Sequence, residues 1–128
     1  MAGEFIADNA FDNGLTYIDS NGETLYITSQ VATTYAEANS TYKLGTKTSI
    51  TIGVPEAGAT DGRRVIVSAI TDGTVDSTGT ATHWAVCKDS PTSELLATGP
   101  LTSSQAVTAS NTFTTDALSI TFRDATVT

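Results

Sequence analysis

The chain has 128 residues, a length that fits one domain and allows a buried core without metal or disulfide staples. Its net charge is −8, with 6 basic and 14 acidic residues, so we expect neither nucleic acid nor a membrane surface as a partner. Only 16% of the residues are charged and 25 are Thr, a β-branched residue suited to strands, so the composition favours an all-β domain.

The first segment, residues 5–22, is predicted to be a helix. Its apolar residues recur at the spacing of one helical face: Ala7, Phe11, Leu15 and Ile18. Gly14 lies in the middle and costs about 1 kcal/mol relative to Ala. Asn21 and Gly22 tolerate the left-handed backbone that closes many helices, so the helix is predicted to end there.

A strand over residues 23–29 is followed by a second helix candidate. Thr34 and Glu37 have the spacing of a capping box, which predicts a short helix from Tyr35 to Tyr42 that ends before Gly45. The alternative for this segment is an irregular loop rich in Thr and Ser.

From Lys47 onward the hydrophobic pattern changes to a period of two, which is typical of strands. Strands are predicted at 48–54, where Ile50, Ile52 and Val54 share a face, and at 63–71, which has apolar residues on both faces. Turns are predicted at 55–62 and 71–79. Further strands are expected at 80–89, 93–101, 104–110, 111–115 and 118–125.

This spacing predicts a mainly β fold, a β-sandwich or barrel of about six to eight short antiparallel strands with an N-terminal helix and a second short helix. We expect a single domain over residues 1–128, in which a helix-containing segment, 1–45, packs on a β-rich region, 46–128. The start of the sequence has no secretory signal and the chain has no apolar run of membrane-spanning length, so we expect a protein made and kept in the cytoplasm before any assembly.

The stretch TATHWAVCKD, residues 80–89, contains the one His, Trp and Cys of the chain. In a strand His83 and Cys87 share a face but lie about 13 Å apart. A nucleophile and its base must approach to about 3 Å, so these two residues cannot form a catalytic dyad. Trp84 is of the kind that anchors a core. The stretch is therefore interpreted as a core strand.

Other chemical motifs are also missing from the sequence. It has no GxSxG elbow, Walker loop or GxGxxG motif, and one His and one Cys are too few for a zinc site. The turns DNG and DSNGE resemble calcium loops in composition only. Nothing favours any pair among the 14 carboxylates as an acid–base couple. We expect a protein that is not an enzyme and needs no cofactor or metal.

With the elements laid out in this way, the sequence resembles a family of small virion proteins of tailed bacteriophages. The resemblance rests on the start AGEFIADNAFDNGLTYIDSNGETLYITSQ, the segment YAEANSTYKLG, and the β-rich strings TGTATHWAV, LLATGPLT and ITFRDA. It implies a structural virion component, most simply a capsid decoration or cement protein that binds the exterior of the head. Its implied partners are the major capsid protein or other virion subunits, together with copies of the chain itself.

Large apolar residues near the N-terminus suggest where such contacts lie. The interface residues predicted are Phe5, Ile6, Tyr17, Tyr35 and Tyr42. The alternative role for these side chains is a lid over one end of the β fold. Two alternative functions stay open: a tail or head–tail connector subunit, and a β-sandwich module that binds carbohydrate or acts as an adhesin.

Overall fold

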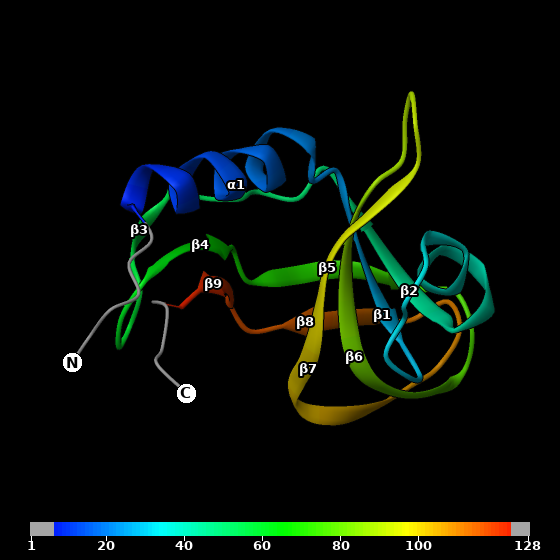
Figure 1. Ribbon diagram of the computed structural model, residues 1–128. Helices are drawn as coiled ribbons and strands as arrows, with labels where there is room; N and C mark the ends of the chain where they lie inside the picture. Colours follow the sequence, from blue (N-terminus) through cyan, green and yellow to red (C-terminus); the bar gives the residue numbers. More distant parts are fainter. Residues whose placement is uncertain (1–6, 124–128) are drawn as a thin grey trace.

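The structure is a computed structural model that describes residues 7–123. It is mainly β, as predicted, with a helix at the N-terminal end and one short helical segment (Figure 1). The elements follow in the order α1 (Asp8–Asn21), β1 (Thr24–Thr28), η1 (Glu37–Thr41), β2 (Lys43–Thr48), β3 (Glu56–Ala57), β4 (Arg63–Val67), β5 (Ile70–Val75), β6 (Gly79–Lys88), β7 (Glu94–Val107), β8 (Thr112–Thr115) and β9 (Leu118–Phe122).

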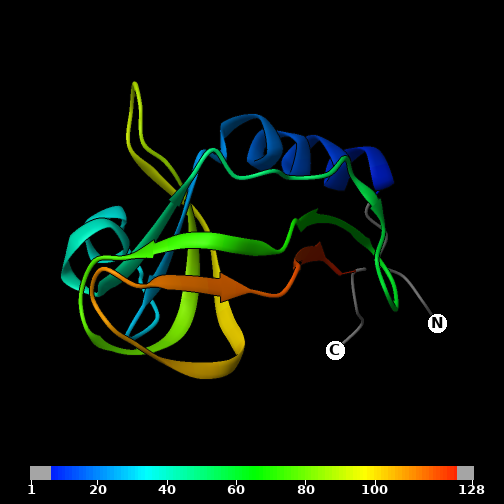
Figure 2. The ribbon, with the colours of Figure 1, turned by 180° about the vertical axis from the view of Figure 1, so that it is seen from behind.

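The strands form two antiparallel sheets. The larger sheet has the order β7-β6-β1-β2-β5-β8 and the smaller one β3-β4-β9. Both views of the ribbon show the large sheet curling, with β4 and β9 continuing β5 and β8 towards the end where α1 begins (Figures 1 and 2). As a result β7 and β8, the two edges of the large sheet, lie on either side of an opening in a partial barrel.

Helix α1 covers the small sheet and forms as its apolar spacing predicted. Phe11, Leu15 and Ile18 are buried, and the ring of Phe11 meets the ring of Phe122 edge to face at 5.8 Å. Arg63 Nε on β4 donates to Asp12 Oδ1 at 2.8 Å and ties the helix to the strand below it. The prediction was wrong for Ala7, which is exposed because it is the extended N-cap residue and not part of the helical face.

Gly22 ends α1, but not in the predicted left-handed conformation. Its φ is −72°, and its N–H donates to the carbonyl of Ile18 at 2.7 Å. The requirement for glycine is spatial, because a Cβ at this position would lie 2.7 Å from Cδ1 of Ile52.

The second helical segment is present, in a wider form than expected. Helical backbone starts at Tyr35 and becomes a π-helix over η1. The Glu37 N–H donates to Thr34 Oγ1 at 3.1 Å, which is one half of the predicted capping box. The Glu37 carboxylate instead accepts from the N–H and hydroxyl of Thr33, both at 2.8 Å. Gly45 lies inside β2 and does not end this helix.

Several strand predictions in the middle of the chain were wrong. The segment 48–54 is not a strand: β2 ends at Thr48, Ser49 has φ 55° and turns the chain, and Ile52 makes only an isolated bridge with Val67. Val54, predicted on the inner face of that strand, is 74% exposed. The loop predicted at 55–62 contains the two-residue strand β3.

The chain around residue 70 also differs from its prediction. The single strand expected at 63–71 is split between β4, in the small sheet, and β5, in the large one. The turn expected at 71–79 is largely β5, because backbone pairing with β2 and β8 overrides the turn preference of Asp72 and Gly73. The two strands expected at 93–101 and 104–110 are one long strand, β7.

The N-terminal part of the chain contributes more than a helix. Strands β1 and β2 pair with each other and fill the centre of the large sheet between β6 and β5. The main core gathers aliphatic side chains from both sheets around Trp84 and Phe113. Among the helices of residues 7–123, none has the length and apolar character needed to cross a membrane.

Candidate functional site

The stretch that holds His83, Trp84 and Cys87 is β6, and the structure confirms that it is a core strand. Trp84 is 6% exposed and belongs to the main core, while Cys87 lies in a second buried cluster on the opposite face. Burial raises the pKa of the Cys87 thiol to about 12, so the thiolate form is scarce near neutral pH. The ring Nδ1 of His83 lies 2.8 Å from the hydroxyl of Thr82.

A polar cluster surrounds Asp89, directly after β6. Its Oδ1 accepts from the hydroxyls of Tyr26 at 2.9 Å and Tyr35 at 2.8 Å, and its Oδ2 accepts a short hydrogen bond from Thr24. The Asp89 N–H donates in turn to Glu23 Oε1 at 2.6 Å. These bonds are internal to the protein, so the cluster holds the base of the β6–β7 hairpin in place.

Two of the predicted interface tyrosines also hold this hairpin. Tyr17 on α1 is 48% exposed, and its hydroxyl donates to Glu94 Oε1 at 2.6 Å. Tyr35 is half-buried against the second cluster and is bound to Asp89. Tyr42 is half-buried between η1 and β2. The structure brings Tyr17 and Tyr35 to the same hairpin by different routes, and the interface prediction for these residues stays a prediction.

The other two predicted interface residues, Phe5 and Ile6, lie outside the described residues.

The edge strand β7 has an unusual composition. It is 14 residues long, more than twice the usual strand length, and Glu94 at its start is its one charged residue. Edge strands are normally kept short or charged, because their free N–H and C=O groups invite pairing with another chain. Pro100 removes one N–H donor from the strand. The outer edge of β7 is therefore a neutral pairing surface on an acidic protein.

This edge forms one wall of a groove, which we call the β7–β9 slot. The opposite wall is the continuous stretch from Thr114 to Thr121 on β8 and β9. Two adjoining hollows of about 250 and 590 Å³ make up the slot and share Thr102 and Leu118. Gly99 leaves room for the floor, because a Cβ there would lie 2.8 Å from the Trp84 ring.

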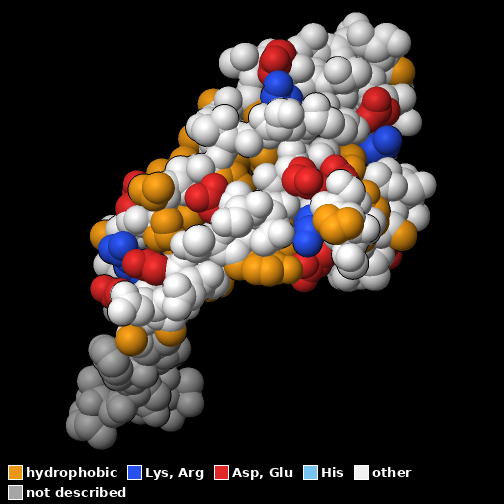
Figure 3. All heavy atoms as spheres, turned by 90° about the horizontal axis from the view of Figure 1, so that it is seen from above, with side chains coloured by type: hydrophobic (Ala, Val, Ile, Leu, Met, Phe, Trp, Pro, Cys, Tyr) orange, Lys and Arg blue, Asp and Glu red, His pale blue; other side chains and the backbone are white. Residues whose placement is uncertain are grey.

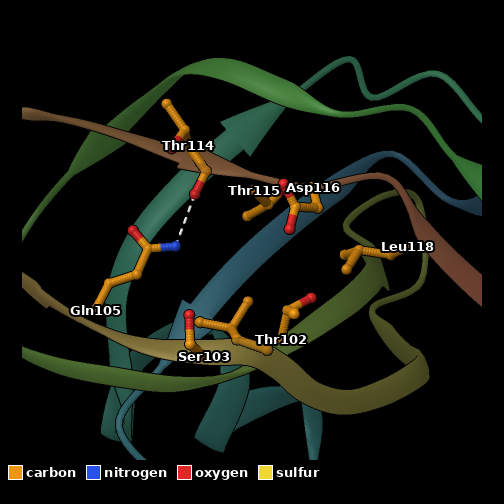
Figure 4. Close-up of a pocket in the computed structure, with 8 residues that line it drawn as sticks. Thr102, Ser103, Gln105, Thr114, Thr115, Asp116 and Leu118 are labelled. Atoms are coloured by element: carbon orange, nitrogen blue, oxygen red, sulfur yellow. Dashed lines mark hydrogen bonds between the residues drawn. The ribbon is translucent and has the colours of Figure 1, made fainter.

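A side chain bridges the slot at its narrow end. Gln105 on β7 donates from Nε2 to the carbonyl oxygen of Thr114 on β8 at 2.7 Å, as the dashed line in Figure 4 shows. Within the described chain, β7 pairs with β6 and β8 pairs with β5, and no backbone ladder joins β7 to β8. The Gln105 amide thus supplies a donor that the N–H of a neighbouring strand would otherwise supply.

Two buried hydroxyls at the slot have no hydrogen-bond partner among residues 7–123: Oγ1 of Thr98 and Oγ1 of Thr115. Thr115 is 7% exposed and lines the smaller hollow, and Thr98 lines the larger one. A buried hydroxyl without a partner costs about 1–3 kcal/mol, so such groups are uncommon away from binding sites. No other buried side-chain polar atom in the described part of the chain lacks a partner.

The sequence analysis did not find either feature. The uncharged run from Leu95 to Val107 is visible in the sequence and could have indicated a neutral edge. The Asp89 cluster gave no such signal, since its partners lie between 54 and 65 positions away in the chain.

Metal-binding chemistry is not apparent in residues 7–123, where no group of three or more His, Cys, Asp or Glu side chains is placed to hold an ion. On the face seen from above, acidic and basic side chains are interspersed with small hydrophobic areas (Figure 3). Comparison of the chain with protein-family models, with curated proteins and with solved structures finds no match.

Proposed function

We propose that the protein is a non-catalytic structural component of a tailed-bacteriophage virion, a decoration protein that binds the exterior of the capsid. The observation that carries the proposal is the neutral, unpaired outer edge of β7 on a protein with a net charge of −8. A long pairing edge without charged gatekeepers suits a contact with another protein. The resemblance to small virion proteins supplies the setting for that contact.

The rest of the fold supports a binding role. The β6–β7 hairpin is held at its base by Asp89 and by the Tyr17–Glu94 hydrogen bond, so β7 is presented on a fixed support. A binding edge held in advance loses little conformational entropy on association. The acidic surface also disfavours contact with the packaged DNA.

The proposal is tested by co-sedimentation of the purified protein with DNA-free capsids of the phage that encodes it, with its solution mass measured by light scattering. We expect saturable binding at a fixed ratio to the capsid subunit. Absence of binding by the folded protein would overturn the capsid role and would favour a tail subunit or a glycan-binding module, which are tested with purified tails and glycan arrays.

A matched pair of variants shows whether β7 makes the contact. Ser103 on β7 and Ser20 on α1 are both exposed. Ser103→Glu places a charge on the neutral edge and should weaken capsid binding. Ser20→Glu adds the same charge to the helix and should leave binding unchanged. Equal binding by both variants would remove the β7 edge from the proposal.

A further inference from the structure

We infer that the β7–β9 slot binds an extended, uncharged peptide segment of another protein, which lies between the two walls as an added strand. The inference rests on the proposal that the β7 edge is a protein-binding surface. It does not depend on the virion setting.

The first argument is the backbone of the two walls. Within residues 7–123, β7 is the last strand of the large sheet and β9 is the last strand of the small one. The walls of the slot are therefore two strand edges, each with backbone groups that are not used in a ladder. An extended segment between them would offer N–H and C=O groups in two directions, which is the mode of strand addition.

The second argument is the pair of buried hydroxyls. Thr98 Oγ1 and Thr115 Oγ1 lie one on each side of the slot and lack partners. A bound segment would supply carbonyl or hydroxyl groups to both. Gln105 shows that this part of the wall already accepts a substitute for a strand donor, through its bond to the carbonyl of Thr114 (Figure 4).

The lining decides the chemistry of the segment. Of the residues that line the two hollows, Asp116 is the one acidic residue and Arg123 the one basic residue; the others are hydroxyl, amide or apolar. Trp84, Leu118 and Ile120 provide apolar surface in the larger hollow. The complementary ligand is uncharged, with small or hydroxyl residues and one aliphatic side chain directed towards Trp84.

The geometry favours a free segment over the edge of a second folded copy. An edge strand of a folded copy brings its own sheet with it, whereas the slot has a wall on each side and room for one chain. The hollows are also too small for a folded element, at about 250 and 590 Å³. A flexible tail or loop of a partner protein meets both conditions.

The test is a selection from a displayed library of random twelve-residue peptides on the immobilised full-length protein, followed by affinity measurements with the enriched peptides. We expect enriched sequences that are uncharged and rich in Thr, Ser, Val and Ala. On binding, the backbone amides of β7 and β9 should exchange hydrogen more slowly. Failure to enrich any sequence, or enrichment of charged ones, would overturn the inference.

Three variants locate the binding. Ser103→Trp fills the smaller hollow, which Ser103 lines, and should abolish peptide binding, while Ser20→Trp on α1 should not change it. Thr115→Val removes one unpartnered hydroxyl without changing the shape of the side chain. It should weaken peptide binding about fivefold, the loss of one hydrogen bond, while the melting temperature of the free protein stays the same or rises.

Peptide binding that survives Ser103→Trp would place the site elsewhere and overturn the inference. These results are distinguishable from failure of the proposed function. Peptide binding in the slot without capsid binding would retain the slot and remove the capsid, and capsid binding without any slot peptide would do the reverse.

Discussion

The hydroxyl of Tyr35 donates to Oδ1 of Asp89 at 2.8 Å, and the two residues are 54 positions apart in the chain. The same oxygen accepts from Tyr26 on β1. One carboxylate therefore joins the segment before η1, the central strand β1 and the base of the β6–β7 hairpin. Because β7 begins in this hairpin, the Asp89 cluster sets the position of one wall of the slot.

Asp89→Ala should destabilise the protein by about 3 kcal/mol, because the nearly buried hydroxyls of Thr24 and Tyr26 lose their acceptor at about 1–3 kcal/mol each. Tyr35→Phe, which removes one partly exposed donor, should cost about 1 kcal/mol. Urea unfolding followed by the fluorescence of Trp84 measures both. Asp116→Ala, at an exposed position, is the control, and equal losses from Asp89→Ala and Asp116→Ala would contradict a role for the cluster.

The same cluster predicts a loss of stability at alkaline pH. Burial raises the pKa of Tyr26 above its ordinary value of 10.0, and its hydrogen bond to Asp89 acts in the same direction. The pKa of Tyr35 is raised as well, by burial and then by Asp89. The folded protein therefore holds these protons more tightly than the unfolded chain. This contribution to stability is complete below pH 10 and is lost as the pH rises above it.

Denaturant unfolding at a series of pH values from 8 to 12 measures this effect, and Tyr26→Phe should flatten the fall in stability above pH 10. Tyr17→Phe is the comparison, since Tyr17 is exposed and its bond to Glu94 is screened by water. A stability curve that is the same for the Tyr26→Phe variant and the unmodified protein would refute the assignment.

The Cys87 thiol should be unreactive in the folded protein. The residue is fully buried, and burial raises its pKa to about 12. Reaction with an aromatic disulfide reagent at pH 8 should therefore be negligible without denaturant and should proceed at the rate of unfolding in urea. Complete labelling of the native protein within seconds would show that the β6 face is open.

Sequence reasoning succeeded where one element carries its own signal. The spacing of Phe11, Leu15 and Ile18 was sufficient for α1, and the Thr34–Glu37 spacing was sufficient for the segment that leads into η1. The mainly β class followed from alternation and from the abundance of Thr. Trp84 was correctly placed in the core, since a lone Trp on a central strand has few other roles.

It failed where pairing between distant strands overrides local preference. Asp72 and Gly73 have the composition of a turn, yet they lie in β5 because β2 and β8 pair on its two sides. The segment 48–54 alternates like a strand, yet the turn at Ser49 removes it from both sheets. The slot depends on which strands end each sheet, and no local pattern contains that information.

The glycine that permits this arrangement is Gly73. A Cβ built there would lie 2.2 Å from the ring of Phe113, which is 2% exposed and sits in the core between β5 and β8. Gly73→Ala should therefore cost about 1–3 kcal/mol, because the close-packed core must shift to admit one methyl group. Gly53→Ala is the matched control, since its Cβ would have its nearest neighbour at 3.7 Å, an ordinary contact. Thermal unfolding of the two variants should show a lower melting temperature for Gly73→Ala and little change for Gly53→Ala. Equal melting temperatures would mean that β5 and β8 are not packed as closely as the structure has them.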